Sequence, residues 1–87
     1  MADSTVDAVR MLLTTELGLG ADAAERLAAD SPLFGELPEL DSMAVERVLA
    51  AMEQRFDIHI DPDDVDAELF ETPATLAALV ERKRAEL

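Results

Sequence analysis

LDSMAVERVLAAMEQRF, residues 40–56, is the stretch that predicts the fold of this chain. Its apolar residues recur at spacings of three, four and seven, which is the repeat of one face of an α-helix. These residues are Val45, Val48, Leu49, Met52 and Phe56. Asp41 and Ser42 suit the start of such a helix, because their side-chain oxygens can accept hydrogen bonds from its free N–H groups. We therefore predict a helix over about 42–55 whose apolar face lies inward.

Ser42 falls at the predicted start of this helix, where its hydroxyl is expected to lie in solvent. The first turn of a helix carries a partial positive charge, and its N–H groups favour anions. A phosphodiester attached to Ser42 would therefore be tolerated electrostatically.

The sequence around Ser42 resembles that of acyl carrier and peptidyl carrier proteins. Residues 41–43, Asp-Ser-Met, are similar to the Asp-Ser-Leu signature of that family, whose serine carries a 4′-phosphopantetheine arm. The resemblance continues with a helix that ends at Phe56, an extended Ile-His-Ile segment, an acidic turn and a closing helix opened by Thr-Pro at 72–73. It covers about 31–83 in order and spacing, and the first helix agrees by its apolar pattern alone.

The resemblance implies a role for Ser42. An external phosphopantetheinyl transferase would move the arm from coenzyme A to Ser42, with Asp41 helping the transferase to recognise the site. The arm's thiol would hold an acyl cargo as a thioester in fatty acid or polyketide biosynthesis. Partner enzymes would be an acyl- or aminoacyl-activating ligase, a synthase or an acyltransferase. Two alternatives remain: a peptidyl or aminoacyl carrier with the same fold and arm, and an unmodified acidic helical adaptor.

Length and composition indicate one small domain over residues 1–87 with a modest core. The chain is 49% hydrophobic, which is enough for it to fold alone. It has no cysteine, which excludes disulfides, thiolate metal sites and cysteine nucleophiles. No apolar run approaches a membrane span, and residues 1–4 lack the basic and apolar parts of a secretory signal. We therefore expect a soluble, cytoplasmic monomer.

The formal net charge is −13, from 20 acidic and 7 basic residues. Nucleic acid is a poor partner for such a surface, because each phosphate contact needs a cation that displaces counterions. Anionic membrane surfaces would be repelled for the same reason. The charge favours a protein partner with a basic patch, whose encounter the acidic field would speed. The alternative is that the acidity serves solubility alone.

The residues before the central helix predict a first helix and a long connection. Ser4 suits the start of a helix over 4–17, and Gly18 is placed to end it in the left-handed conformation. Within the connection over 18–41, the alanine-rich stretch 21–29 could form a short helix. The connection should then be irregular and be pinned to the core by Leu33, Phe34 and Leu37. Its prolines limit its freedom, which would hold the following serine presented rather than buried.

The central helix is expected to present an outward face to partners. On that face we place Ala44, Glu46, Arg47, Ala50, Glu53 and Gln54. The resemblance implies that this face, with Met43, is the recognition surface beside the arm, and the alternative is an ordinary solvated face. Met43 itself is expected to seat inward and fix the entry of the helix, because methionine conserves the volume of the leucine in the signature.

Some residues depart from the family pattern. Glu39-Leu40 stands where Gly-Ala is common, Met43 replaces leucine, and Arg47 lies where housekeeping fatty-acid carriers usually place an acid. These differences favour a specialised carrier, served for example by a stand-alone acyl- or aminoacyl-activating ligase.

The acidic run at 61–66 does not fit a calcium-binding loop. Counted from Asp61, the loop pattern would need an oxygen ligand at Val65, a glycine at Asp66 and a glutamate at Thr72. The run instead predicts a short third helix over about 62–67.

Asp61 would cap this third helix, Pro62 would lie in its first turn and Val65 would be buried. His59, between the inward-pointing Ile58 and Ile60, is expected to lie in solvent. A lone histidine without cysteine or a second histidine predicts no metal site.

The last predicted helix covers about 73–85 and starts with a Thr-Pro cap. Apolar anchors before it and a stripe along it are expected to face inward: Leu69, Phe70, Leu76, Leu79 and Val80. The basic residues 82–84 lie in its last turns, where cations complement the helix dipole.

The sequence thus predicts an all-α fold with helices at about 4–17, 42–55, 62–67 and 73–85. With the resemblance, this pattern implies a small four-helix bundle of the acyl-carrier type, with a long loop between the first and second helices and a short third helix. Interior methionine and alanine would adapt to an acyl chain held between the helices, which we treat as a hypothesis.

Catalysis by the chain itself is not expected. Ser42 lacks a Gly-x-Ser-x-Gly elbow, and the single histidine should be remote and exposed. No aromatic-lined pocket is evident that would raise the pKa of one carboxylate of a pair. The expected role is that of a substrate shuttle, whose tether raises the concentration of cargo at other active sites.

Overall fold

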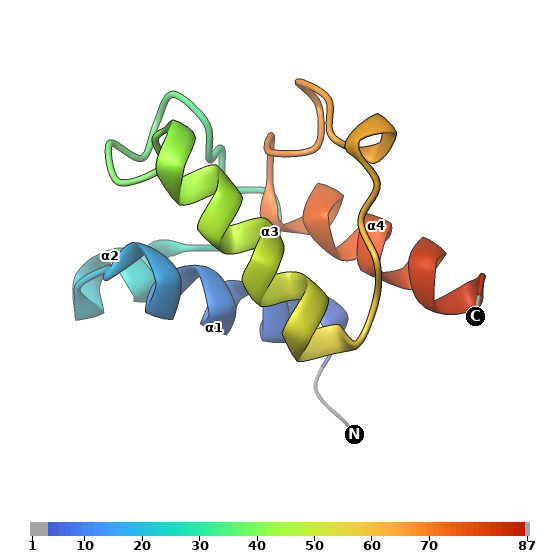
Figure 1. The fold of residues 1–87 in the computed structure, drawn as a ribbon. Helices are drawn as coiled ribbons and strands as arrows, with labels where there is room; N and C mark the ends of the chain where they lie inside the picture. The colour runs from blue at the N-terminus through green and yellow to red at the C-terminus, as the bar shows by residue number, and fades with distance from the viewer. Residues whose placement is uncertain (1–3, 87) are drawn as a thin grey trace.

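The computed structural model describes residues 4–86, and the helical segments within that range follow one another without a strand. They are α1 (Thr5–Leu17), α2 (Ala21–Arg26), α3 (Ser42–Phe56), the 3₁₀ turn η1 (Pro62–Asp64) and α4 (Pro73–Ala85) (Figure 1). The all-α prediction is confirmed. The expectation about a secretory signal concerns mainly residues 1–3, which lie outside the described range.

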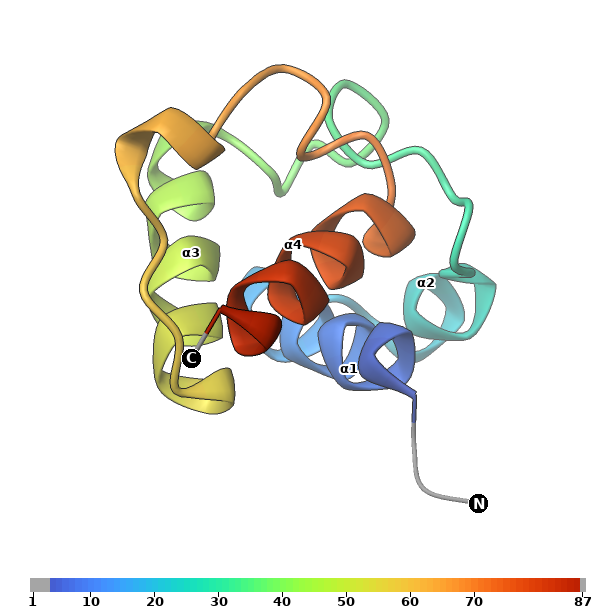
Figure 2. The same cartoon turned by 90° about the vertical axis from the view of Figure 1, so that its right-hand side faces the viewer.

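The helices enclose one apolar core. α1 packs against both α3 and α4, α2 lies against α1, and α3 also meets α4. The side chains without exposed surface come from all three long helices and from one residue of the connection before α3: Val9, Leu13, Leu33, Ala44, Val48, Met52, Leu76 and Val80. At one end of this core, the connections 27–41 and 65–72 lie together (Figures 1 and 2).

The ends of the long helices follow the residue types found there. The Ser4 hydroxyl accepts a hydrogen bond from the backbone N–H of Asp7 at 3.1 Å, which caps α1. Gly18 ends α1 with φ 63°, a left-handed conformation that glycine adopts without steric strain. The Thr72 hydroxyl likewise accepts from the backbone N–H of Thr75 at 3.2 Å and caps α4. The predicted bounds of these helices are therefore close to the observed ones.

The connection before α3 is held by backbone hydrogen bonds to the chain before α4. The N–H of Leu33 donates to the carbonyl of Glu71 at 2.9 Å, and that of Phe34 donates to Phe70 at 3.1 Å. Leu33 is buried as predicted, but the prediction for Phe34 is wrong, because its side chain is 64% exposed. Its backbone is pinned while its ring stands at the surface.

The third helix is shorter than predicted. Only Pro62–Asp64 is helical, and the chain becomes extended at Val65. The Asp64 carboxylate turns back to accept from the N–H of Asp61 at 2.9 Å, which closes a single turn. Val65 is 37% exposed, so the expectation that it would be buried is also wrong.

Candidate functional site

The candidate site is the start of α3. Asp41 is the N-cap: its Oδ1 accepts from the backbone N–H of Ala44 at 2.8 Å. Ser42 is the first residue of α3 and is exposed. Ser42 therefore lies at the positive end of the helix dipole. The residue is exposed rather than buried, as predicted.

A groove of about 330 Å³ adjoins this serine. Its lining residues come from three segments: Phe34 from the connection before α3, Ser42 and Val45 from α3, and Val65, Asp66, Ala67 and Phe70 from the chain before α4. Most of these side chains are apolar. The groove thus offers a chain attached at Ser42 a hydrophobic surface within immediate reach.

The residues at the start of α3 fit the phosphopantetheine group. Its phosphodiester would lie by the free N–H groups of the first helical turn, which favour an anion. The rest of the arm would have the groove beside Ser42 to lie against. No buried side chain would have to move for attachment, because Ser42 is exposed.

The inward face of α3 differs from the prediction at its first turn. Ala44 has no exposed surface, so placing it on the outward face was wrong. It begins a buried stripe that continues at intervals of four residues with Val48, Met52 and Phe56. Met43 is 72% exposed, so its predicted inward seat was also wrong. Ala44 lies one turn before Val48, so the repeat that places Val48 and Met52 in the core also places Ala44 there.

The outward face of α3 includes the other predicted recognition residues. Met43, Glu46, Arg47, Ala50 and Gln54 are exposed. Met43 and Arg47 are one turn apart and therefore neighbours on the helix surface. A large apolar side chain thus stands beside a cation, near the serine.

Glu53 is tied into the structure rather than freely outward. Its Oε2 accepts from the backbone N–H of Ile60 at 2.8 Å. The same oxygen lies 3.5 Å from Nδ1 of His59, whose side chain is 80% exposed as predicted. Glu53 therefore fixes the chain that leaves α3.

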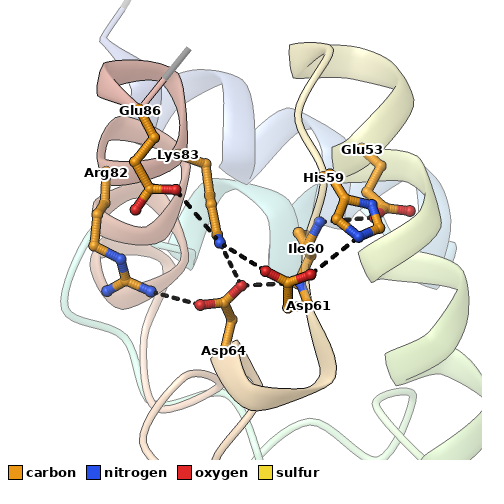
Figure 3. A network of polar contacts seen from close by, with 8 residues as sticks. All are labelled: Glu53, His59, Ile60, Asp61, Asp64, Arg82, Lys83 and Glu86. Carbon is orange, nitrogen blue, oxygen red and sulfur yellow. Dashed lines mark hydrogen bonds and ion pairs between the residues drawn. The ribbon is translucent and has the colours of Figure 1, made fainter.

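Sequence reasoning missed a polar network between α4 and η1 (Figure 3). Lys83 is only 9% exposed, and its Nζ lies 2.7 Å from Oδ2 of Asp64 and 3.4 Å from Oδ2 of Asp61. Arg82 reaches Oδ1 of Asp64 at 3.2 Å, and Nε2 of His59 lies 3.1 Å from Oδ1 of Asp61. The sequence analysis predicts a role for the basic residues 82–84 at the helix dipole, and only the fold brings Lys83 to η1.

The ion pair between Lys83 and Asp64 shifts the pKa values of both groups in the direction that favours their charged forms. The hydrogen bond from Lys83 and then the one from the Asp61 backbone hold the pKa of Asp64 below its usual 3.8. The hydrogen bond to Asp64 raises the pKa of Lys83 above its usual 10.5. Both groups are therefore charged at neutral pH.

Other site types are not found in the described part of the chain. Among residues 4–86, no three His, Asp or Glu side chains are grouped so that they could hold a metal ion. Within the same range, no helix has the length and apolar character needed to cross a membrane.

Comparison with known proteins identifies the family. The sequence pattern described as "phosphopantetheine attachment site" matches residues 7–80, a range that contains Ser42 and the groove. A similar solved structure is the solution NMR structure of a holo acyl carrier protein from Nitrosomonas europaea. It is 43% identical, with a TM-score of 0.86, over 95% of this chain and 99% of that one. A comparison with curated proteins finds no match. The chain therefore belongs to the acyl carrier protein family, whose cofactor is covalently attached 4′-phosphopantetheine.

Proposed function

We propose that Ser42 is the residue of this acyl carrier protein that bears the 4′-phosphopantetheine arm. The observation that carries the proposal is an exposed serine at the first position of α3, beside a largely apolar groove. Ser4 and Ser31 are the other serines of the chain. Ser4 caps α1, and the Ser31 hydroxyl accepts from the backbone N–H of Ala28 at 2.8 Å, so both hydroxyls have structural roles.

The chain's own residues hold and present the arm. Asp41 caps α3 and so fixes the position of Ser42, and the N–H groups of the first turn offset the charge of the phosphodiester. The arm supplies a thiol that carries an acyl group as a thioester. Phe34, Val45 and Phe70 in the groove would shield the apolar part of the arm or its cargo from water.

The chain carries no catalytic function in this proposal. His59 lies near Glu53 and Asp61, and Glu53 is roughly 16 Å along the axis of α3 from Ser42 at 1.5 Å per residue. A base at that distance cannot take a proton from the serine. The chemistry of attachment and acyl transfer therefore belongs to partner enzymes.

The proposed partners are a phosphopantetheinyl transferase and an acyl- or aminoacyl-activating ligase, synthase or acyltransferase with a basic patch. The net charge of −13 supports a basic docking surface. Within the outward face of α3, Met43 and Arg47 suit a partner that offers an apolar pocket beside an acidic group. Ala44 has no part in this surface because it is buried.

Intact mass tests the attachment. Incubation with coenzyme A and a phosphopantetheinyl transferase of broad specificity should add the mass of one phosphopantetheinyl group to the wild-type protein. Ser42→Ala should gain nothing, while Thr15→Ala, which removes an exposed hydroxyl from α1, should gain as the wild type does. A gain that persists in a folded Ser42→Ala protein would reject Ser42 as the attachment residue.

A further inference from the structure

Lys83 joins α4 to η1 through a side chain that is almost fully buried. Its Nζ lies close to three carboxylates: Asp64 at 2.7 Å, Asp61 at 3.4 Å and Glu86 at 3.6 Å. Figure 3 shows the lysine reaching from α4 toward Asp64 of η1 and toward Asp61, the residue that precedes η1. Such a lysine is costly to bury without partners, so its position depends on these carboxylates.

The chain that enters η1 is anchored at the buried Ile60, whose N–H donates to Glu53, but η1 itself adds no side chain to the core. None of its three residues is buried. The ion pairs that join η1 and its N-cap Asp61 to α4 are those of Lys83 with Asp61 and Asp64 and the more exposed pair between Arg82 and Asp64. Its attachment to α4 is therefore electrostatic.

The chain that follows η1 is one wall of the groove beside Ser42. Residues 65–67 line the groove and start directly after η1, and the N–H of Val65 still donates to the carbonyl of Pro62 at 3.2 Å. The wall at Phe34 and Phe70 is held differently, by the backbone hydrogen bond between these two residues. A displacement of η1 from α4 would thus move the wall at 65–67 and leave the other in place.

We propose that Lys83 is a positioning residue for the groove of Ser42: by pairing with Asp64 and Asp61 it holds η1 on α4 and so fixes the wall at 65–67. The space beside the arm is then set by a side chain on a different helix. The identity of the group that occupies the groove depends on the proposed function. The positioning of residues 65–67 by Lys83 does not depend on it.

Hydrogen exchange on the protein without the arm tests whether Lys83 keeps η1 attached to α4. In Lys83→Met, which keeps a long apolar side chain but leaves the carboxylates unneutralised, the amides of Asp61, Asp64 and Val65 should exchange about tenfold faster, the scale of one lost hydrogen bond to a charged group. The amides of Leu33 and Phe34, which bond to Glu71 and Phe70, should not change and serve as an internal reference.

Three further variants separate positioning from folding. Lys83→Arg keeps the cation and should restore slow exchange. Arg84→Met removes an exposed cation from the same turn of α4 and should behave as wild type. Asp64→Asn removes the partner on η1 without altering α4, and it should reproduce the faster exchange even if Lys83→Met fails to fold. Equal acceleration throughout the chain, or no acceleration in either folded variant, would overturn the proposal.

A second measurement tests whether Lys83 affects how well the groove accommodates an acyl chain. Protein loaded with acyl chains of increasing length should gain melting temperature over unloaded protein of the same variant. In Lys83→Met this gain should shrink, because a loose wall must become ordered when the chain binds, and in Lys83→Arg it should return. A purely structural lysine would lower the loaded and unloaded forms equally and leave the gain unchanged, which would contradict the proposal. Failure of Ser42 to accept the arm would refute only the proposed function, because the exchange test uses unmodified protein.

Discussion

Two connections meet beside Ser42, and they are fixed by different forces. The connection before α3 is held by backbone hydrogen bonds, from Leu33 to Glu71 and from Phe34 to Phe70, and by the buried side chain of Leu33. Residues 65–67, the first part of the connection before α4, instead follow η1, which is paired with α4 through Arg82 and Lys83 (Figure 3). One wall of the groove thus depends on main-chain pairing and burial, and the other depends on side-chain charge.

This difference determines which wall of the groove can change position when the pH or the salt concentration changes. Backbone hydrogen bonds do not titrate and do not depend on the identity of an exposed side chain. Ion pairs weaken when either partner loses its charge and, where exposed, when salt is added. The wall at 65–67 is therefore the adjustable side of the groove.

The largest loss of stability should come from a substitution in the connection before α3, which is held in place by the buried side chain of Leu33. Leu33→Ala removes a side chain with no exposed surface and should lower the free energy of unfolding by about 2–5 kcal/mol. Phe34→Ala, its neighbour with a 64% exposed ring, should change it by about 0.5 kcal/mol or less. Chemical denaturation of both variants measures the difference. Equal losses would mean that Phe34 packs in the core and that this wall is wrongly assigned.

The next effect should come from the start of α3, which both walls flank. Asp41→Ala removes the acceptor for the N–H of Ala44 and should destabilise the protein by about 1 kcal/mol, as read from thermal melts. Asp41→Asn keeps an acceptor and should melt near the wild type. If the transferase reads the charge of Asp41, Asp41→Asn should still load more slowly. Normal loading of the stable Asp41→Asn protein would assign Asp41 to capping alone.

The long helices could be predicted because their signals are local. The apolar period of α3 and the Thr72-Pro73 start of α4 specify helices whatever the rest of the chain does. Ser42 was located in the same way, from the helix boundary and its neighbours. The family resemblance then added the chemistry.

The errors at the site have tertiary or geometric causes. Hydrophobicity ranks Met43 above Ala44, yet Ala44 lies four residues before the buried Val48 and shares its face, so the helix repeat buries the alanine and exposes the methionine. Asp64 closes η1 locally on Asp61, but its pairing with Lys83 could not be predicted, because no local pattern connects the two residues. Contacts between distant segments decide such features.

At low pH and at high pH, residues 65–67 should become displaced from their place beside the groove, while the connection before α3 should keep its position. The pKa of Asp64 is lowered by Lys83, so its contribution to stability is complete above pH 3.8 and is lost as the pH falls through the lowered pKa. The pKa of Lys83 is raised, so its contribution is complete below pH 10.5 and is lost as the pH rises through the raised pKa. Methyl NMR signals of Val65 should shift in both limits, and those of Leu33 should not shift with them. A single midpoint shared by both residues would indicate global unfolding instead.

The smallest change in hydrogen exchange should come from the loss of Arg82, the exposed cation that pairs with Asp64. Arg82 is 57% exposed on its side chain, so its pair with Asp64 should contribute little to stability, as exposed ion pairs do. Arg82→Gln should therefore speed exchange at Asp64 and Val65 less than Lys83→Met does. The difference between Arg82→Gln and wild type should fade with added salt, because the screening length is about 10 Å at 0.1 M. If Arg82→Gln matched Lys83→Met, the exposed pair rather than the buried lysine would be what holds η1 to α4.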